Sequence, residues 1–421
     1  MQAPTAAEPA SRPRVATLGT VAAARVRGTP RLLAGLSGVL ALLCALAGGV
    51  GGLTAYNSAT ALSRAQTDTE QVVRAQTIAG DLLRTDATAA TAFLVAGAES
   101  PEQRETFSQA LGSASTLSSR AAAGQPADGE ALARLSEQIV VYAELVEHAR
   151  ADNRQGLTVG KRYQQLASDH LRVQALPLVG AVIDANEQRL GVHGGGEISW
   201  PQRQVWALTA TLVPVLVLLV IFSVWLARRT HRYVNPGVGL ALVLLAASGV
   251  AGIAVQAGVA LELSTFRDGA YASASRLAQA RTLVYELRAS ESLALIARSS
   301  TGDEREWDQT YARLHTILDS EQVALQQAQA YQGVHTEIIR LEAASGDYDA
   351  AVALAVDPDR SKFEPLAAAV DEAAGEAADA ALSELTGGRR LMALAFVQPV
   401  AGLVAAWQLL RGVQARIREY L

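Results

Sequence analysis

The chain has 421 residues, half of them hydrophobic, and a formal net charge of −5. Only Lys161 and Lys362 are lysines, and Cys44 is the single cysteine. One cysteine excludes an intrachain disulfide and a metal site built from several cysteines. We expect neither a cofactor nor a nucleic-acid partner.

Four apolar runs without interior charges divide the sequence. They cover residues 32–54, 205–227, 237–261 and 391–410. Each approaches the ~20 residues that a helix needs to cross a ~30 Å hydrocarbon core. The first run exceeds the usual 7–15 apolar residues of a signal peptide, so we interpret it as a signal anchor. The runs predict four transmembrane helices.

Arginine positions predict the topology. The N-terminal tail (1–31), the loop 228–236 and the C-terminal tail (411–421) together hold 11 basic residues and two acidic ones, Glu8 and Glu419. Positive residues near membrane spans stay in the cytoplasm. We therefore expect a plasma-membrane protein with both termini cytoplasmic and with residues 55–204 and 262–390 outside.

The first extracellular segment shows helical periodicity. Ile78, Leu82, Ala89 and Phe93 share one helix face. Ser100, Pro101 and Gln103 form an N-cap signature, and breaks are expected at 124–129 and at Gly156. The pattern predicts a four-helix bundle with helices near 55–97, 101–122, 128–155 and 158–192.

The second half repeats the first. AQTIAGDLLR (75–84) resembles AQARTLVYELR (278–288), and PEQRETF (101–107) resembles DEREW (303–307), at an offset of about 200 residues. Thr301 and Glu304 would repeat the capping box. Helices from 262 to 388 are expected to break near Gly333, Gly346 and Pro358. We predict an all-α polytopic membrane protein with two tandem extracellular helical bundles from an internal duplication.

No catalytic motif is present. The six histidines have no metal-ligand spacing, and phosphate-binding loops and nucleophile elbows are absent from the sequence. The predicted cytoplasmic segments total 51 residues, from 31, nine and 11, which is too few for a kinase or cyclase. We expect a protein that is not an enzyme.

Two polar stretches are candidate partner-binding sites. The turn between the third and fourth bundle helices is either a solvated turn or a docking surface, and an up-down bundle places it at the same end as the first turn. Its candidate residues are Asp152, Asn153, Arg154 and Gln155. The predicted cytoplasmic loop offers a second set for lipid or protein, which is Arg228, Arg229 and Arg232.

Small and polar residues in the spans predict helix contacts. Gly48 and Gly52 form a small-xxx-small pair that permits close helix approach, in this chain or in a homodimer. Gln256 and Gln398 are expected to form interhelical hydrogen bonds. Gly194 to Gly196 are interpreted as a hinge.

The plan of spans and bundles, with NRQG (153–156) followed by VGKRYQQLAS (159–168), resembles a family of actinobacterial membrane proteins. Members are encoded beside a glutamine-binding lipoprotein and the soluble serine/threonine protein kinase G. The resemblance implies that an extracellular solute-binding lipoprotein senses amino acids, docks on the bundles and alters the cytoplasmic kinase. The bundles also resemble chemoreceptor sensor domains, although no HAMP-like linker or signalling coiled coil follows a span.

The leading hypothesis is a non-enzymatic transmembrane signal transducer that relays amino-acid availability from the lipoprotein to the kinase. Two alternatives stay open. The bundles would bind a small molecule directly, which predicts a polar pocket between helices, or the chain would be a structural or assembly factor of the envelope.

Overall fold

The computed structural model describes residues 18–95, 99–191, 200–230, 235–298, 303–344, 346–384 and 388–419. Every element in these ranges is helical and none of their residues lies in a strand, which confirms the all-α fold class. The chain divides into two compact units. Unit 1 is Met1–Ala59, Trp200–Val259 and Arg389–Leu421, and unit 2 is Thr60–Ser199 and Ala260–Gly388.

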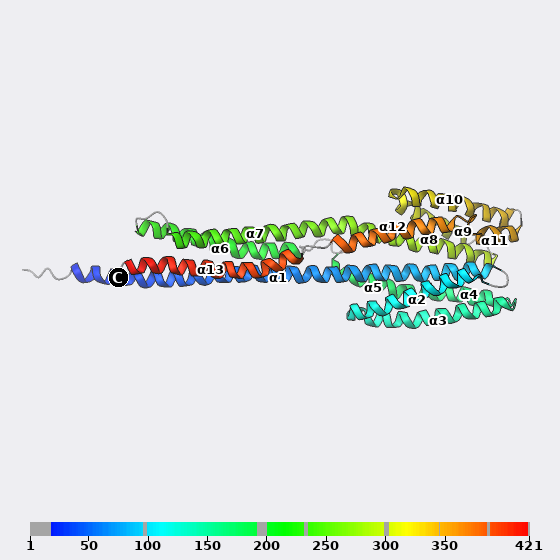
Figure 1. Cartoon of the computed structure of the whole chain (residues 1–421), viewed down its shortest axis with the longest axis horizontal. Helices are drawn as coiled ribbons and strands as arrows, with labels where there is room; N and C mark the ends of the chain where they lie inside the picture. The colour runs from blue at the N-terminus through cyan, green and yellow to red at the C-terminus, as the bar shows by residue number, and fades with distance from the viewer. Residues whose placement is uncertain are drawn as a thin grey trace, which may run out of the picture. The chain divides into compact units, whose positions relative to one another are not determined.

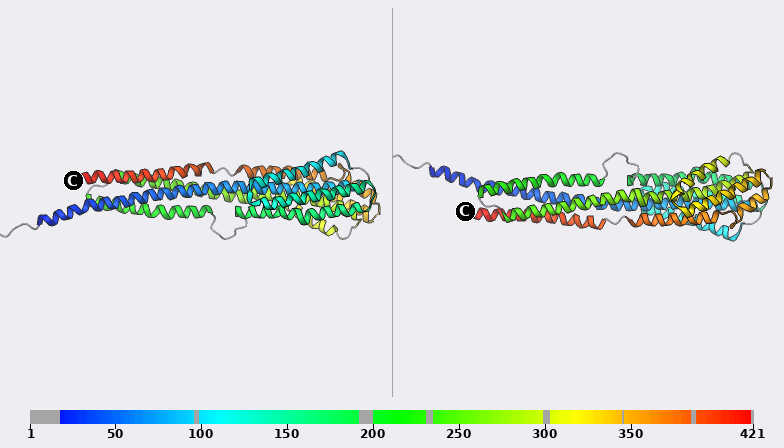
Figure 2. Two further views of the ribbon diagram at one scale, coloured as in Figure 1. Left: turned by 90° about the horizontal axis from the view of Figure 1, so that it is seen from below. Right: turned by 90° about the horizontal axis from the view of Figure 1, so that it is seen from above.

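Unit 1 is built from the four apolar helices, which run alongside one another (Figure 2). They are α1 (Leu18–Leu94), α6 (Trp200–Thr230), α7 (Pro236–Phe266) and α13 (Gly388–Glu419). Each contains one predicted span and is long and apolar enough to cross a membrane. The chain is therefore a multi-pass membrane protein.

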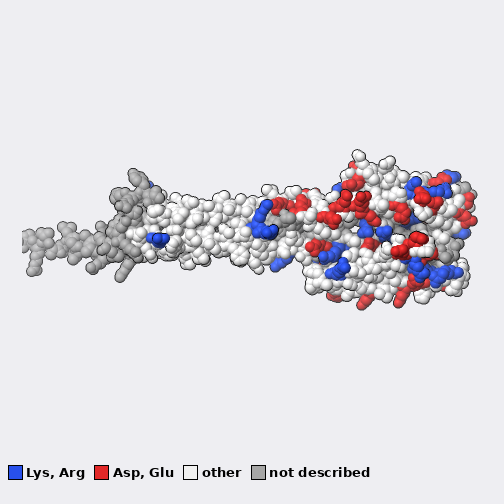
Figure 3. Space-filling model, viewed as in Figure 1, with Lys and Arg blue, Asp and Glu red and all other residues white. Residues whose placement is uncertain are grey.

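The outer surface of unit 1 suits lipid. Large apolar side chains such as Leu42, Val243 and Phe396 are more than half exposed, and the described surface of this unit carries few charges on the face seen in Figure 3. Unit 2 is densely covered with charged residues on the same face. The contrast follows the different solvents of a bilayer and of water.

Small residues let α1 approach α13 closely within unit 1. A Cβ atom on Gly48 would lie 2.7 Å from the Gln398 carbonyl oxygen and from the Gly402 Cα atom. Gly52 faces Pro399 in the same way, because a Cβ atom on Gly52 would meet the Pro399 Cγ. The predicted glycine pair is thus used for a contact inside this chain.

Gln256 forms the predicted interhelical hydrogen bonds. Its Oε1 accepts from the Ser58 hydroxyl at 3.0 Å, and its Nε2 donates to the Thr54 Oγ1 at 3.2 Å. Gln256 is 1% exposed, so these bonds satisfy a buried amide that would otherwise be costly. They connect α7 to α1.

The first bundle of unit 2 combines residues 60–94 of α1 with six further helical elements (Figure 1). These are α2 (Pro101–Gly124), a 3₁₀ turn η1 (Pro126–Asp128), α3 (Gly129–Arg154), α4 (Val159–His170), a π-helical turn η2 (Leu171–Ala175) and α5 (Leu176–Leu190). The predicted helix boundaries agree within a few residues. The predicted glycine hinge at 194–196 lies outside the described residues.

The predicted capping box at the start of α2 is confirmed. The Ser100 hydroxyl accepts from the Gln103 amide, and the Gln103 side chain accepts from the Ser100 amide, both at 3.2 Å. The bundle core contains the predicted Ile78, Leu82 and Ala89, all at most 4% exposed. Capping and an apolar stripe together fix where the helices begin and which face they bury.

The second bundle repeats this plan with more interruptions. Its elements are η3 (Arg267–Tyr271), α8 (Ala272–Ala297), α9 (Asp303–Ile317), η4 (Leu318–Ser320), α10 (Gln322–Ile339), η5 (Arg340–Ala344), α11 (Tyr348–Val356) and α12 (Phe363–Glu384). Breaks near Gly346 and Pro358 are as predicted. Thr301 of the expected second capping box lies outside the described residues.

The predicted break at Gly333 is wrong, because Gly333 lies inside α10. A glycine within a helix costs only about 1 kcal/mol relative to alanine, and the packing of α10 outweighs that cost. The break occurs instead at η4 and Glu321, where the backbone leaves the helical region with φ −107° and ψ 77°. Buried Leu318 and Ala324 hold both sides of this turn against the bundle core.

Candidate functional site: the interface between the repeats

The two repeats of unit 2 meet along α1 and α8. Side chains about 200 positions apart form hydrogen bonds there, which are Gln76 with Ser275 at 3.4 Å, Asp81 with Arg281 at 2.9 Å, and Thr91 with Ser292 at 3.0 Å. Because the sequence repeat has the same offset, corresponding levels of the two helices lie opposite each other. The repeats pack as two subunits of a symmetric dimer would.

An ion cluster joins the repeats at the middle of this interface. The Arg281 Nη2 lies 2.9 Å from the Asp81 Oδ1, and its Nε lies 2.8 Å from the Asp371 Oδ1 on α12. Tyr285 donates to the other oxygen of Asp371 at 2.9 Å. Gly80 makes room for the Arg281 guanidinium, since a Cβ atom on Gly80 would lie 2.8 Å from the Arg281 Nη1.

The electrostatics of this cluster favour the charged form of Arg281. Burial alone would lower the pKa of Arg281, but the carboxylates of Asp371 and Asp81 outweigh that effect and raise the pKa above its usual value. The Arg281 side chain is 16% exposed. A permanent cation thus lies between two carboxylates contributed by different repeats.

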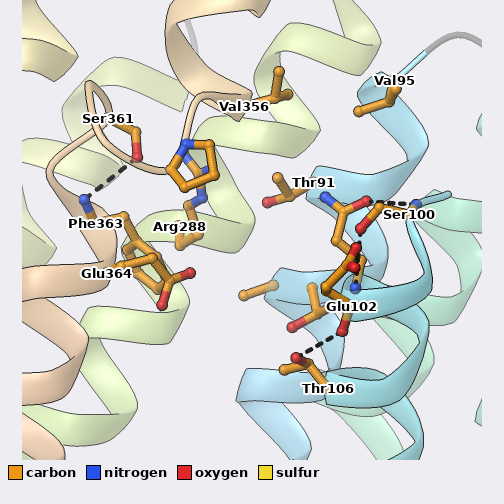
Figure 4. A pocket seen from close by; sticks show the side chains of 14 residues that line it. Thr91, Val95, Ser100, Glu102, Thr106, Arg288, Val356, Ser361, Phe363 and Glu364 are labelled. Carbon is orange, nitrogen blue, oxygen red and sulfur yellow. Dashed lines mark hydrogen bonds between the residues drawn. The ribbon is translucent and has the colours of Figure 1, made fainter.

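A pocket of about 530 Å³ opens between the repeats, and we call it the α2 pocket (Figure 4). The first repeat lines it with the end of α1 and the start of α2, and the second repeat with α8 and the segment between α11 and α12. Figure 4 shows Thr91, Ser100 and Glu102 on one side and Arg288, Ser361 and Glu364 on the other. Its volume is in the range of small-molecule sites.

Arg288 is the buried cation of the α2 pocket. It is 5% exposed, and its Nη1 and Nη2 donate to the Glu291 Oε1 at 2.8 Å and to the Ala355 carbonyl at 2.6 Å. The other Glu291 oxygen lies 2.7 Å from the His335 Nδ1, and the His335 ring stacks on Trp307 with 3.6 Å between centroids. Glu291 and the Ala355 carbonyl therefore fix the position of the Arg288 guanidinium, and His335 in turn fixes Glu291.

Glu291 is charged in this arrangement. Burial would raise the pKa of its carboxyl, but the hydrogen bond from His335 and the charge of Arg288 outweigh burial and lower that pKa. Glu102 and Glu364 lie at the pocket rim, in the first turns of α2 and α12, and are exposed. The pocket thus combines the fixed guanidinium of Arg288 with a surface carboxylate from each repeat, which suits a small polar ligand.

Among the described residues, no three His, Cys, Asp or Glu side chains form a group suited to a metal ion. The α2 pocket is lined by hydroxyl groups that serve as helix caps or bond their own helix, such as Ser100 and Thr106. The arrangement is suited to binding a polar ligand.

A second buried charge lies in the first bundle. Asp86 is fully buried, accepts from the Ser168 hydroxyl at 2.6 Å and from Tyr142 at 3.5 Å, and lies 3.9 Å from the Arg172 Nη2. Burial raises the pKa of its carboxyl and outweighs the nearby Arg172. The Asp86 Oδ2 and the Arg172 Nε and Nη2 are buried without a hydrogen-bond partner.

The predicted docking residues of the third turn have different roles. Asp152 and Asn153 are half-buried, and the Asn153 amide donates to the Phe93 carbonyl at 3.3 Å, so the first and third turns share one end of the bundle as expected. Arg154 and Gln155 are exposed. Leu157 and Val159, which the sequence reasoning passed over, are 47% and 49% exposed beside them.

Two of the three predicted loop arginines, Arg228 and Arg229, lie at the end of α6. Arg228 is exposed, Arg229 belongs to α6, and Arg232 lies outside the described residues. Sequence reasoning also missed Arg281 and Arg288. Both lie in the repeated segment 278–288, and the opposite charges of Asp81 and Arg281 at an offset of 200 residues were the available signal.

Residues 61–193 match the family model described as an actinobacterial sensor domain. This match covers most of the first bundle and supports a sensing or signalling role in an actinobacterial membrane. No curated protein and no solved structure gave a match to the chain.

Proposed function

We propose that the chain is a non-enzymatic transmembrane signal transducer. Unit 2 would lie outside the plasma membrane and both termini in the cytoplasm, as the arginine distribution favours. The observation that carries the proposal is the polar interface between the repeats, where Arg281 joins Asp81 to Asp371. Buried ion pairs have strict geometry, so a bound partner that shifts one repeat would exchange one arrangement for another.

The extracellular input would be an amino-acid signal delivered by a solute-binding lipoprotein. The exposed end of the α3–α4 turn, with Arg154 and Gln155, is a candidate docking surface. The output would be a cytoplasmic serine/threonine kinase, as the resemblance of NRQG (153–156) and VGKRYQQLAS (159–168) to the actinobacterial family implies. Arg228 and its neighbours Arg229 and Arg232 would contact that kinase or anionic lipid.

The experiment is affinity purification of the tagged full-length protein from its native membrane after gentle crosslinking, with and without added glutamate and glutamine. Recovery of both a solute-binding lipoprotein and a soluble kinase would support the relay. Recovery of neither partner under either condition would reject it. A variant with Arg154 and Gln155 changed to alanine should lose the lipoprotein and keep the kinase.

A second candidate, direct sensing of a small molecule, is favoured by the α2 pocket. Its 530 Å³ volume and the buried, preorganised Arg288 are what such a site requires. In this case ligand binding would bridge the first repeat at Glu102 and the second at Arg288. Thermal stabilisation of the purified protein by candidate metabolites, lost on Arg288→Met, would distinguish this function from the relay.

A further inference from the structure

Unit 2 contains a second cavity between the repeats, which we call the α4 pocket. It measures about 230 Å³. The first repeat contributes α4 and η2, and the second repeat contributes α8 and α9. Its charged lining residues are Arg162, Asp169 and Arg172 from the first repeat and Glu286 and Glu306 from the second.

The α2 and α4 pockets occupy equivalent places in the duplicated fold. In the α2 pocket, positions 87–95 of α1 and Thr106 of α2 lie against the start of α12 in the second bundle. Positions about 200 residues later in the chain belong to α8 and α9 and include Glu306. They line the α4 pocket, where they lie against α4 and η2 of the first bundle. Duplication therefore produced two related cavities at one interface.

Opposite charges face each other across the α4 pocket without pairing. In the described part of the chain, no ion pair within 4.0 Å joins Arg162 or Arg172 to Glu286 or Glu306, and the one ion pair of Arg172 is the long contact to Asp86. The arginines and glutamates line one cavity but are too far apart to form ion pairs with each other, so their electrostatic attraction is weak. A ligand that carries both signs of charge would lie close to both groups and gain a stronger interaction with each.

The geometry points to a ligand site in the α4 pocket for a small zwitterion, whose carboxylate lies against Arg162 and Arg172 and whose ammonium group lies against Glu286 and Glu306. The hydroxyls of Ser290 and Thr310 in the same wall supply neutral hydrogen-bonding groups. Arginine is suited to the carboxylate because its guanidinium forms two parallel hydrogen bonds to it. Such a ligand bridges the repeats.

This inference concerns a site other than the α2 pocket and does not depend on the cytoplasmic relay. The full-length protein in lipid nanodiscs would be titrated by calorimetry with three zwitterions of increasing charge separation, glycine, β-alanine and γ-aminobutyrate. Butyrate and butylamine carry one charge each and serve as ligand controls. Glu306→Gln and Arg162→Gln remove one charge from each wall, and Glu137→Gln is the matched change outside both pockets.

At least one zwitterion should bind, with both single-charge controls at least about tenfold weaker, because each loses one charged contact. Glu306→Gln and Arg162→Gln should each weaken binding about tenfold, while Glu137→Gln, at an exposed position outside both pockets, leaves it unchanged. Circular dichroism melting of each variant reports whether it folds, and both mutated side chains are exposed, so folding should be preserved.

Three results would overturn the inference. They are no binding by any zwitterion, equal binding by butyrate, and binding that Glu306→Gln weakens no more than Glu137→Gln does. Partner recovery after crosslinking is measured on the same variants. Failure of zwitterion binding with intact recovery of the partners rejects the α4 site alone and leaves the proposed relay standing.

Discussion

Replacing Arg281 with methionine should destabilise unit 2 strongly. The substitution keeps most of the side-chain volume but leaves Asp81 and Asp371 without their shared cation. Removing one partner of a buried ion pair costs about 3–5 kcal/mol. Asp371 is 27% exposed and Asp81 still accepts from Ser113 at 2.6 Å, so we expect a cost somewhat below this scale, about 2–4 kcal/mol.

The assay is thermal unfolding of the full-length protein in nanodiscs, followed by circular dichroism. About 2–4 kcal/mol corresponds to a fall of roughly 4–16 °C in Tm for a domain of this size. Arg134→Met is the matched control, because Arg134 pairs only with exposed Glu130 and is itself 63% exposed, and such pairs are worth about 0–1 kcal/mol. Equal Tm values for the two variants would refute the reasoning.

Three further changes test other parts of the structure by the same assay. Gly48→Ala should lower Tm by the equivalent of about 1–3 kcal/mol, because its Cβ would meet the backbone of Gly402. Gly49→Ala should leave Tm unchanged, because nothing lies within 4 Å of a Cβ at that position. An equal fall in Tm for both variants would contradict this prediction. Ser100→Ala should cost about 1 kcal/mol through the lost N-cap, and unchanged amide exchange in the first turn of α2 would count against it. Asp86→Asn should raise Tm at neutral pH, because burial raises the pKa of Asp86 and its charged carboxyl therefore opposes folding. The wild-type protein escapes this cost below the unfolded pKa of about 3.9, where the carboxyl is protonated in both states, and it loses stability as pH rises through the folded pKa. A gain in Tm that persists unchanged below pH 3.9 would contradict this reasoning.

The fold followed from local signals in the sequence. Apolar runs marked the four span-length helices, and the cap at Ser100 and the glycine at 156 marked helix ends, because these features act within a few residues. The break predicted at Gly333 was wrong because the packing of α10 outweighs the cost of one glycine inside the helix. The internal repeat predicted that α8 would correspond to α1, but not that the two helices would contact each other.

The candidate site could not be predicted in the same way, because its residues converge only through packing. Arg288 meets the Ala355 carbonyl 67 positions later in the chain, and Arg281 meets Asp371 90 positions later. No periodic pattern in the sequence indicates contacts between residues separated by 67 or 90 positions. Arg154 and Gln155, at the end of α3, could be chosen from the sequence because turn chemistry is local and therefore visible.

The duplication also explains how this interface differs from that of a homodimer. In a symmetric dimer, equivalent positions on the axis carry the same residue, as Thr91 and Ser292 nearly do. The Asp81–Arg281 ion pair is not repeated in this way, because at the offset of 203 residues between Ala75 and Ala278 the counterpart of Asp81 is Val284 and that of Arg281 is Ile78. Joining both copies in one chain allowed the halves to diverge at this level of the interface. The two pockets keep the dimer-like relation, because exchanging the repeats takes one pocket to the other. The arginine of the α2 pocket, Arg288, comes from the second repeat, and those of the α4 pocket, Arg162 and Arg172, come from the first. Ligands in the two pockets would therefore act on the two repeats from opposite sides.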